Sequence, residues 1–215
     1  MSRWRRNPRA SRQRSREQLK RDLNRRIDWL EEELQHLDVE SRLRMRTILQ
    51  LYKDLYGDVD DPDLQDYTIS TFRTSVAQIG SLTERALRLA RKKRDLQRYL
   101  DRNDETQLLN YLQDLQARTE STTDPVIQSQ YEQAMSLKKR ELEDYRAIAT
   151  TVRRIDGQLE NVECAFAGLR ARVVRLKAAD VTQWDVASEQ LKGELESLSS
   201  VVEMLEQSVN EALSI

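Results

Sequence analysis

The longest regular pattern in this sequence is a row of apolar residues that recur at alternating intervals of three and four positions. The row consists of Tyr145, Ile148, Val152, Ile155, Leu159, Val162, Phe166, Leu169, Val173 and Leu176. Residues with this spacing lie on one face of an α-helix, and the repeat is typical of helices that pack against other helices. The pattern predicts one long helix that begins near Pro125 and ends near Leu176.

Three other long segments carry the same spacing, and turn-forming residues are scarce between them. The segments span residues 19–55, 63–100 and 183–212, and a short helix is expected after the N-cap residue Asp104. Only 5 Gly and 3 Pro occur among 215 residues, which argues against β-sandwiches, doubly wound sheets and Gly-rich nucleotide folds. We predict an all-α protein made of elongated antiparallel coiled-coil hairpins that form a helical bundle.

Two loop signals divide the chain, GDVDDPD at residues 57–63 and TESTTDP at residues 119–125. Helical segments of similar length lie on either side of residues 57–63 and on either side of a weaker break at residues 178–182, so we expect two antiparallel hairpins. The predicted organisation is a basic tail without regular structure at 1–18, a first hairpin plus a short helix at 19–118, and a second long hairpin at 119–215.

The long helix is expected to extend beyond its partner helix near its start. An overhanging segment would leave apolar side chains without a partner, which makes them candidates for contact with another subunit. These residues are Tyr131, Met135 and Leu142.

The formal net charge of -1, from 36 Lys and Arg against 37 Asp and Glu, conceals a strong asymmetry. Residues 1–21 carry a charge of +8, and the last 36 residues carry -7. A tryptophan among arginines suits an anionic membrane interface, and the same residue types suit a nucleic-acid backbone. The candidate residues for binding an anionic surface are Arg3, Trp4, Arg5, Arg6, Arg9 and Arg12.

A second basic segment lies between Arg85 and Arg102. Its centre, here called the secondary basic patch, consists of Arg88, Arg91, Lys92, Lys93 and Arg94. The patch could meet an anionic surface, but it could also pair with the acidic last helix of its own chain or of another copy. Lys93 occupies a position at which the spacing of the apolar row predicts an apolar residue.

Residues that could perform catalysis are few. Cys164 and His36 are the only residues of their types, and the sequence has no Gly-rich phosphate loop. Cys164 lies beside the apolar row of its helix, where a thiol behaves as a small apolar residue. The spacing of Glu33 and His36 matches half of a helical di-iron motif, but such a site needs two copies. We therefore expect a protein that is not an enzyme and that has no catalytic residues, cofactor or metal.

In outline the chain resembles the phage-shock-protein-A and ESCRT-III-like family of membrane-remodelling proteins. A basic segment with Trp4 is followed by a long charged helical hairpin and further helices. The resemblance implies that helical hairpins assemble into rods or rings on anionic membranes, with the N-terminal segment as an amphipathic anchor.

The sequence thus predicts a non-enzymatic scaffold that self-associates, acting in the cytoplasm with peripheral contact to an anionic membrane. Two alternatives stay open. One is a nucleic-acid-associated helical protein that uses the same arginines, and the other is an adaptor whose apolar rows bind a partner helix.

Overall fold

The computed structural model describes residues 8–59, 66–177, 193, 195–204, 206, 207 and 209. The helices are α1 (Pro8–Leu34), α2 (Val39–Val59), α3 (Asp66–Arg102), α4 (Glu105–Ser121) and α5 (Pro125–Lys177). The described residues from 195 to 209 are helical too, and no strand occurs in any of these ranges. The all-α prediction is confirmed.

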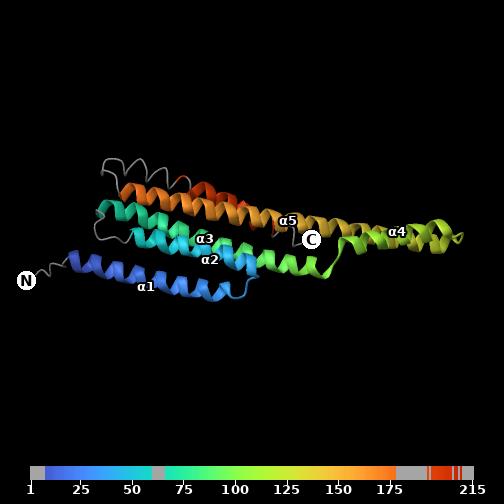
Figure 1. Cartoon of the computed structure of the whole chain (residues 1–215), viewed down its shortest axis with the longest axis horizontal. Coiled ribbons are helices and arrows are strands. Elements are labelled where there is room, and N and C mark those ends of the chain that lie inside the picture. The colour runs from blue at the N-terminus through green and yellow to red at the C-terminus, as the bar shows by residue number, and fades with distance from the viewer. Residues whose placement is uncertain are drawn as a thin grey trace, which may run out of the picture.

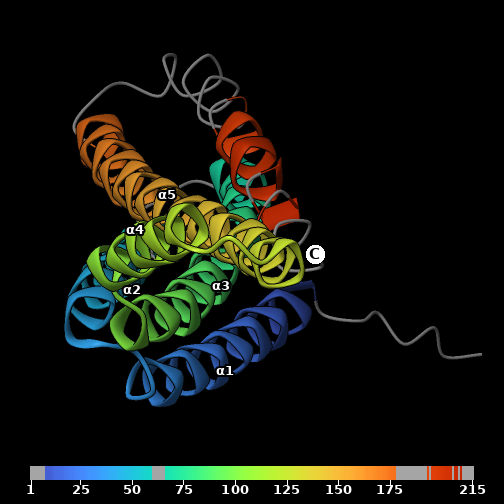
Figure 2. The same cartoon turned by 90° about the vertical axis from the view of Figure 1, so that its right-hand side faces the viewer.

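The molecule is elongated, and α5 runs along most of its length (Figure 1). Helices α2 and α3 lie antiparallel, α4 continues in the direction of α3, and α5 returns past all three. The 53 residues of α5 correspond to about 80 Å of helix. Viewed along the long axis, α1 lies at one edge of the bundle, and the helical residues near 200 lie on the opposite side (Figure 2).

One buried cluster connects the helices of the bundle. The apolar row of α5 contributes Val152, Ile155, Leu159, Val162, Phe166, Leu169 and Val173, all of which are buried. The same cluster includes Leu30 of α1, Tyr52 of α2, Leu89 of α3 and Val202 of the last helix. The predicted units 19–118 and 119–215 therefore share a core.

The expectation of a single helix over residues 19–55 is wrong, because the chain reverses between Leu34 and Val39. Asp38 caps α2, since the Ser41 N–H donates to its carboxylate at 2.9 Å. The Arg42 guanidinium donates to the Leu37 carbonyl at 2.8 Å, which holds the connection in place. The reversal allows the leucines of α1 and the apolar residues of α2 to enter the same core.

The N-terminal segment also differs from its prediction. Residues 8–18, expected to lack regular structure, form the first turns of α1, and residues 1–7 lie outside the described part of the chain. A proline suits the first helical position because its backbone has no N–H that needs a partner.

The two predicted breaks around α4 are confirmed. The Asp104 carboxylate accepts a hydrogen bond of 2.8 Å from the Thr106 N–H and caps α4, and α5 begins at Pro125. Helix α4 pairs with the first part of α5, where an overhang was expected. Leu142 is buried in this hairpin. Tyr131 and Met135 are half-buried, so the segment is partly covered within the chain and is not the unpartnered overhang that was expected.

Candidate functional site

The first residues of the basic segment on α3 pair with the last helix of the same chain. Arg85 Nη1 lies 3.1 Å from Glu203 Oε2, and Arg88 Nε lies 2.7 Å from Glu206 Oε1. The hydrogen bond from Arg88 lowers the pKa of Glu206 against the opposing effect of burial, and the charge of nearby Lys92 lowers it further. Of the alternatives that the sequence left open for this segment, the structure shows pairing with the acidic last helix of the same chain.

Two other residues of the secondary basic patch contact the C-terminal end of α1 and the connection that follows it. Arg91 forms an ion pair with Glu33. The Arg94 guanidinium donates to the backbone carbonyl of His36 at 2.7 Å and pairs with Asp95 at 2.8 Å. These contacts join α3 to the end of α1 and to the connection before α2.

Lys93 is buried, with only 5% of its side chain exposed. Its Nζ lies 2.5 Å from Asp156 Oδ1 and 3.2 Å from Glu40 Oε2. Burial alone would lower the pKa of Lys93, but these two carboxylates outweigh burial and raise the pKa. Sequence analysis identified Lys93 as out of place on an apolar row, but it did not identify its partners on α2 and α5. The secondary basic patch is thus bound mainly to groups of its own chain.

Of the predicted residues for anionic contact, Arg3, Trp4, Arg5 and Arg6 lie outside the described residues, whereas Arg9 and Arg12 lie on α1. The face by which α1 packs on the bundle contains Leu23, Leu30 and Leu34, which are buried. At intervals of three, four and seven residues, Arg9, Arg12, Arg16 and Leu23 occupy the same face of the helix. By their spacing in the sequence, Arg9, Arg12 and Arg16 form a row, here called the arginine row, that continues the helical period of Leu23. The row was not predicted because the helix was expected to begin at residue 19.

The start of α1 is electrostatically unusual. Its first turn holds no acidic residue, although the N-terminal end of a helix carries a partial positive charge that favours anions. The described side chains just before Leu23, those of residues 17, 18 and 20–22, are exposed. An anionic surface would therefore be attracted both by the arginine charges and by the partial positive charge at the start of α1.

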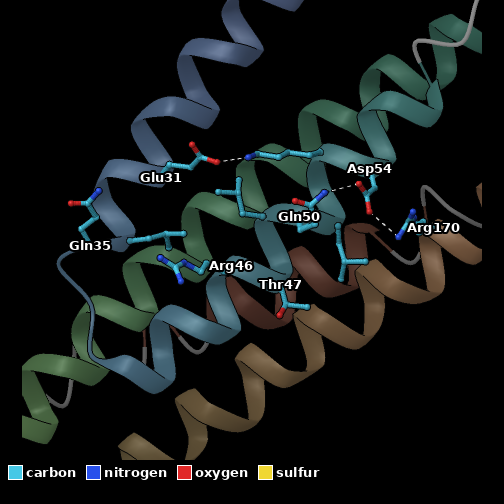
Figure 3. A pocket seen from close by; sticks show the side chains of 11 residues that line it. Glu31, Gln35, Arg46, Thr47, Gln50, Asp54 and Arg170 are labelled. Atoms are coloured by element: carbon cyan, nitrogen blue, oxygen red, sulfur yellow. Dashed lines mark hydrogen bonds and ion pairs between the residues drawn. The ribbon is translucent and has the colours of Figure 1, made fainter.

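An open cleft of about 680 Å³ lies between α1, α2 and α5 (Figure 3). Three polar pairs line it: Lys53 with Glu31, Gln50 with Asp54 at 2.8 Å, and Arg170 with Asp54 at 2.8 Å. Leucines form the remainder of its walls together with Gln35, Arg46 and Thr47. Because the charged groups largely neutralise one another, the cleft lacks a concentrated charge that would select an ionic ligand.

The residues considered for chemistry lie on α5, on α1 and in the connection after α1. Cys164, expected to behave as a small apolar residue beside the apolar row, is exposed on α5. Glu33 is engaged by Arg91. Within the described ranges, no group of three or more His, Cys, Asp or Glu is placed to hold a metal ion. No helix in the same ranges is both long enough and apolar enough to cross a membrane.

The α4–α5 hairpin extends beyond the bundle (Figure 1), and several apolar side chains are exposed on it. Its exposed apolar residues are Leu109, Tyr111, Val126, Ile127 and Leu137. Tyr111 is partly covered by Lys138, whose Nζ lies 5.4 Å from the ring centroid. The apolar residues singled out here from the sequence were Tyr131, Met135 and Leu142, and the exposed residues Val126, Ile127 and Leu137 were not among them.

Comparison with known proteins adds no assignment: no protein-family model, no curated protein and no solved structure matches this chain.

Proposed function

We propose that this protein is a non-enzymatic helical scaffold that self-associates and contacts an anionic membrane surface through the basic N-terminal part of α1. The observation that carries the proposal is the arginine row of Arg9, Arg12 and Arg16, in register with the packing face of a continuous helix.

The distribution of ion pairs supports this assignment to α1. The basic residues of α3 are bound by Glu33, Asp156, Glu203 and Glu206 of the same chain. Helix α1 packs on α2 and α3 at the edge of the bundle, and its first buried leucine is Leu23 among the described side chains. No residue before Leu23 is among the described core residues, so binding of these basic turns to a surface need not disturb the core.

Phosphate groups on anionic lipids would attract these arginines, each contributing about 1 kcal/mol near the surface. Trp4 precedes the row in sequence, and indole rings favour the headgroup region of a bilayer. The proposed mechanism is electrostatic recruitment, with self-association then retaining several copies on the same surface.

Vesicle co-sedimentation tests the role of the arginine row. We expect the triple variant R9Q/R12Q/R16Q to lose about 100-fold in partitioning to vesicles containing phosphatidylserine, because three charges of about 1 kcal/mol each are removed. The matched control R153Q/R154Q/R175Q removes three charges from exposed positions on α5 and should bind as the wild type does. Equal loss in both variants, or equal wild-type binding to neutral phosphatidylcholine vesicles, would refute the proposal.

The nucleic-acid alternative makes a different prediction for the same arginines. It requires a salt-sensitive gel shift with DNA or RNA that the R9Q/R12Q/R16Q variant loses, together with no sedimentation on anionic vesicles. That combination would replace the membrane surface by a nucleic-acid backbone as the partner.

A further inference from the structure

Helix α5 carries a second row of residues on the surface of the hairpin. Val126, Gln130, Gln133 and Leu137 follow one another at intervals of four, three and four, so they share one face of the helix. All four are exposed, with Val126 at 65% and Leu137 at 69%. This face is separate from the one that contains the buried Leu142 and packs on α4.

The row has the same order of residue types from either end: one aliphatic residue, two glutamines and one aliphatic residue. Placing a second α5 antiparallel, with a two-fold axis between residues 131 and 132, sets Val126 against Leu137 of the second copy. The same axis sets Gln130 against Gln133 of the second copy, where the two amides can hydrogen-bond to each other. Such self-complementarity is what a two-fold symmetric contact requires.

We propose that two copies of this chain associate through the surface row of α5 in this antiparallel register. The proposal rests on the self-association part of the proposed function, and it names the surface that performs it. Each aliphatic end of the row is then covered by the opposite end of the partner's row.

Charge favours the antiparallel register. Arg140 follows Leu137 at an interval of three, is exposed, and has no ion-pair partner among the described residues. The proposed axis brings it level with Thr123, next to Asp124 at the tip of the other hairpin, where Glu120 is also exposed. A parallel alignment would instead bring Arg140 against Arg140 of the second copy, which is unfavourable.

The size of the contact predicts its strength. The row and the following Arg140 together extend about 21 Å along the helix, so the interface is smaller than those of permanent dimers. We expect a reversible dimer whose population rises with protein concentration. Recruitment to a membrane surface would raise the local concentration and favour the same contact.

Cross-linking determines the register. In a Cys164→Ser background, the single variants V126C and L137C are mixed and treated with a short bismaleimide. The proposal predicts mixed dimers joining residue 126 to residue 137, because same-residue pairs would lie about 16 Å apart along the helix. If same-residue dimers form as readily as mixed ones, or if no dimers form, the register is wrong.

Sedimentation equilibrium measures the energetic contribution of the row. We expect V126Q/L137Q to raise the dimer dissociation constant by at least about tenfold, because both aliphatic contacts are lost. The matched control V39Q/L43Q alters two exposed aliphatic residues of α2 and should dimerise as the wild type does. A monomeric wild type at all concentrations, or equal dimerisation of V126Q/L137Q and the wild type, would overturn the proposal.

The two proposals fail independently. The V126Q/L137Q variant should still sediment with anionic vesicles, because its α1 arginines are intact. The R9Q/R12Q/R16Q variant should still form the cross-linked dimer in solution, because its hairpin is intact. Loss of both properties in either variant would contradict the separation of the two surfaces.

Discussion

Lys93 shows how one buried charge can fix the relative position of three helices. Its ammonium group on α3 is held by Glu40 of α2 and Asp156 of α5, and the Asp156 carbonyl also accepts a hydrogen bond of 2.9 Å from Arg44. An aliphatic residue at this position would tolerate small sliding of the helices. A charged residue with two specific partners does not tolerate such sliding, because sliding would leave the charge unpaired in the interior.

Removal of this charge should destabilise the bundle because it leaves a half-buried carboxylate without its partner. We expect Lys93→Met to lower the free energy of unfolding by about 2 kcal/mol in urea denaturation. The double variant K93M/D156L removes both groups and should recover most of that loss. Additive losses in the double variant would show that the pair itself contributes little.

Gly80 is the glycine whose missing side chain matters to packing. A Cβ there would lie 2.6 Å from Arg26 Nη1 and 2.8 Å from the Tyr52 hydroxyl. Arg26 uses this space to reach Glu84, with Nε 2.5 Å from Oε1, and the bond attaches α1 to α3. By contrast, nothing lies within 4 Å of a Cβ added at Gly157 or Gly168. A side chain at either of those two positions would therefore meet open space.

The two kinds of glycine should respond oppositely to alanine. Gly80→Ala should lower the free energy of unfolding by about 1 kcal/mol or more, because the clash with buried Tyr52 outweighs the better helix propensity of alanine. Gly157→Ala, the matched control, should raise it by up to about 1 kcal/mol. Urea denaturation of both variants tests the difference, and stabilisation by Gly80→Ala would contradict this account of the contact.

At the scale of elements, the last helix is attached to α3 partly by charge. Arg88 lowers the pKa of Glu206 below its usual value of 4.5. A lowered folded-state pKa means that the ionised carboxylate stabilises the fold above about pH 4.5. That stabilisation is lost as the pH falls through the folded-state pKa.

Thermal unfolding as a function of pH tests this attachment. The melting temperature of wild type should exceed that of Glu206→Gln near neutral pH, and the difference should shrink below about pH 4.5 and vanish in stronger acid. The control E143Q alters an exposed glutamate on α5 and should follow wild type throughout. A constant difference at all pH values would indicate that the substitution acts through packing.

The elements themselves were predictable to different degrees. Helix α5 followed from its periodicity, the N-cap of α4 followed from Asp104, and the start of α5 followed from Pro125, because all of these depend on local chemistry. The break before α2 also has a local cap, Asp38. However, the apolar spacing on either side of it is compatible with one continuous helix, and only packing distinguishes a continuous helix from a reversal.

At the scale of the whole molecule, the two proposed contact surfaces lie far apart. The start of α1 is near one end of the long axis, and the α4–α5 hairpin forms the other end (Figure 1). A scaffold with this arrangement could attach one end to an anionic surface while the other end binds a second copy. The net charge of the chain does not reveal how its basic and acidic residues are distributed. Within the bundle, the α3 arginines and the acidic last helix neutralise each other.

The sequence by itself determined the helical class, the long α5, its buried face and the polarity of charge, since these depend on residue spacing and on composition. The tertiary structure decided which charged side chains are paired within the chain. It pairs most of the secondary basic patch with the protein's own carboxylates and buries Lys93. It also folds α4 onto α5, which leaves the row from Val126 to Leu137 exposed. Those outcomes depend on contacts between residues far apart in the chain, which local periodicity does not contain.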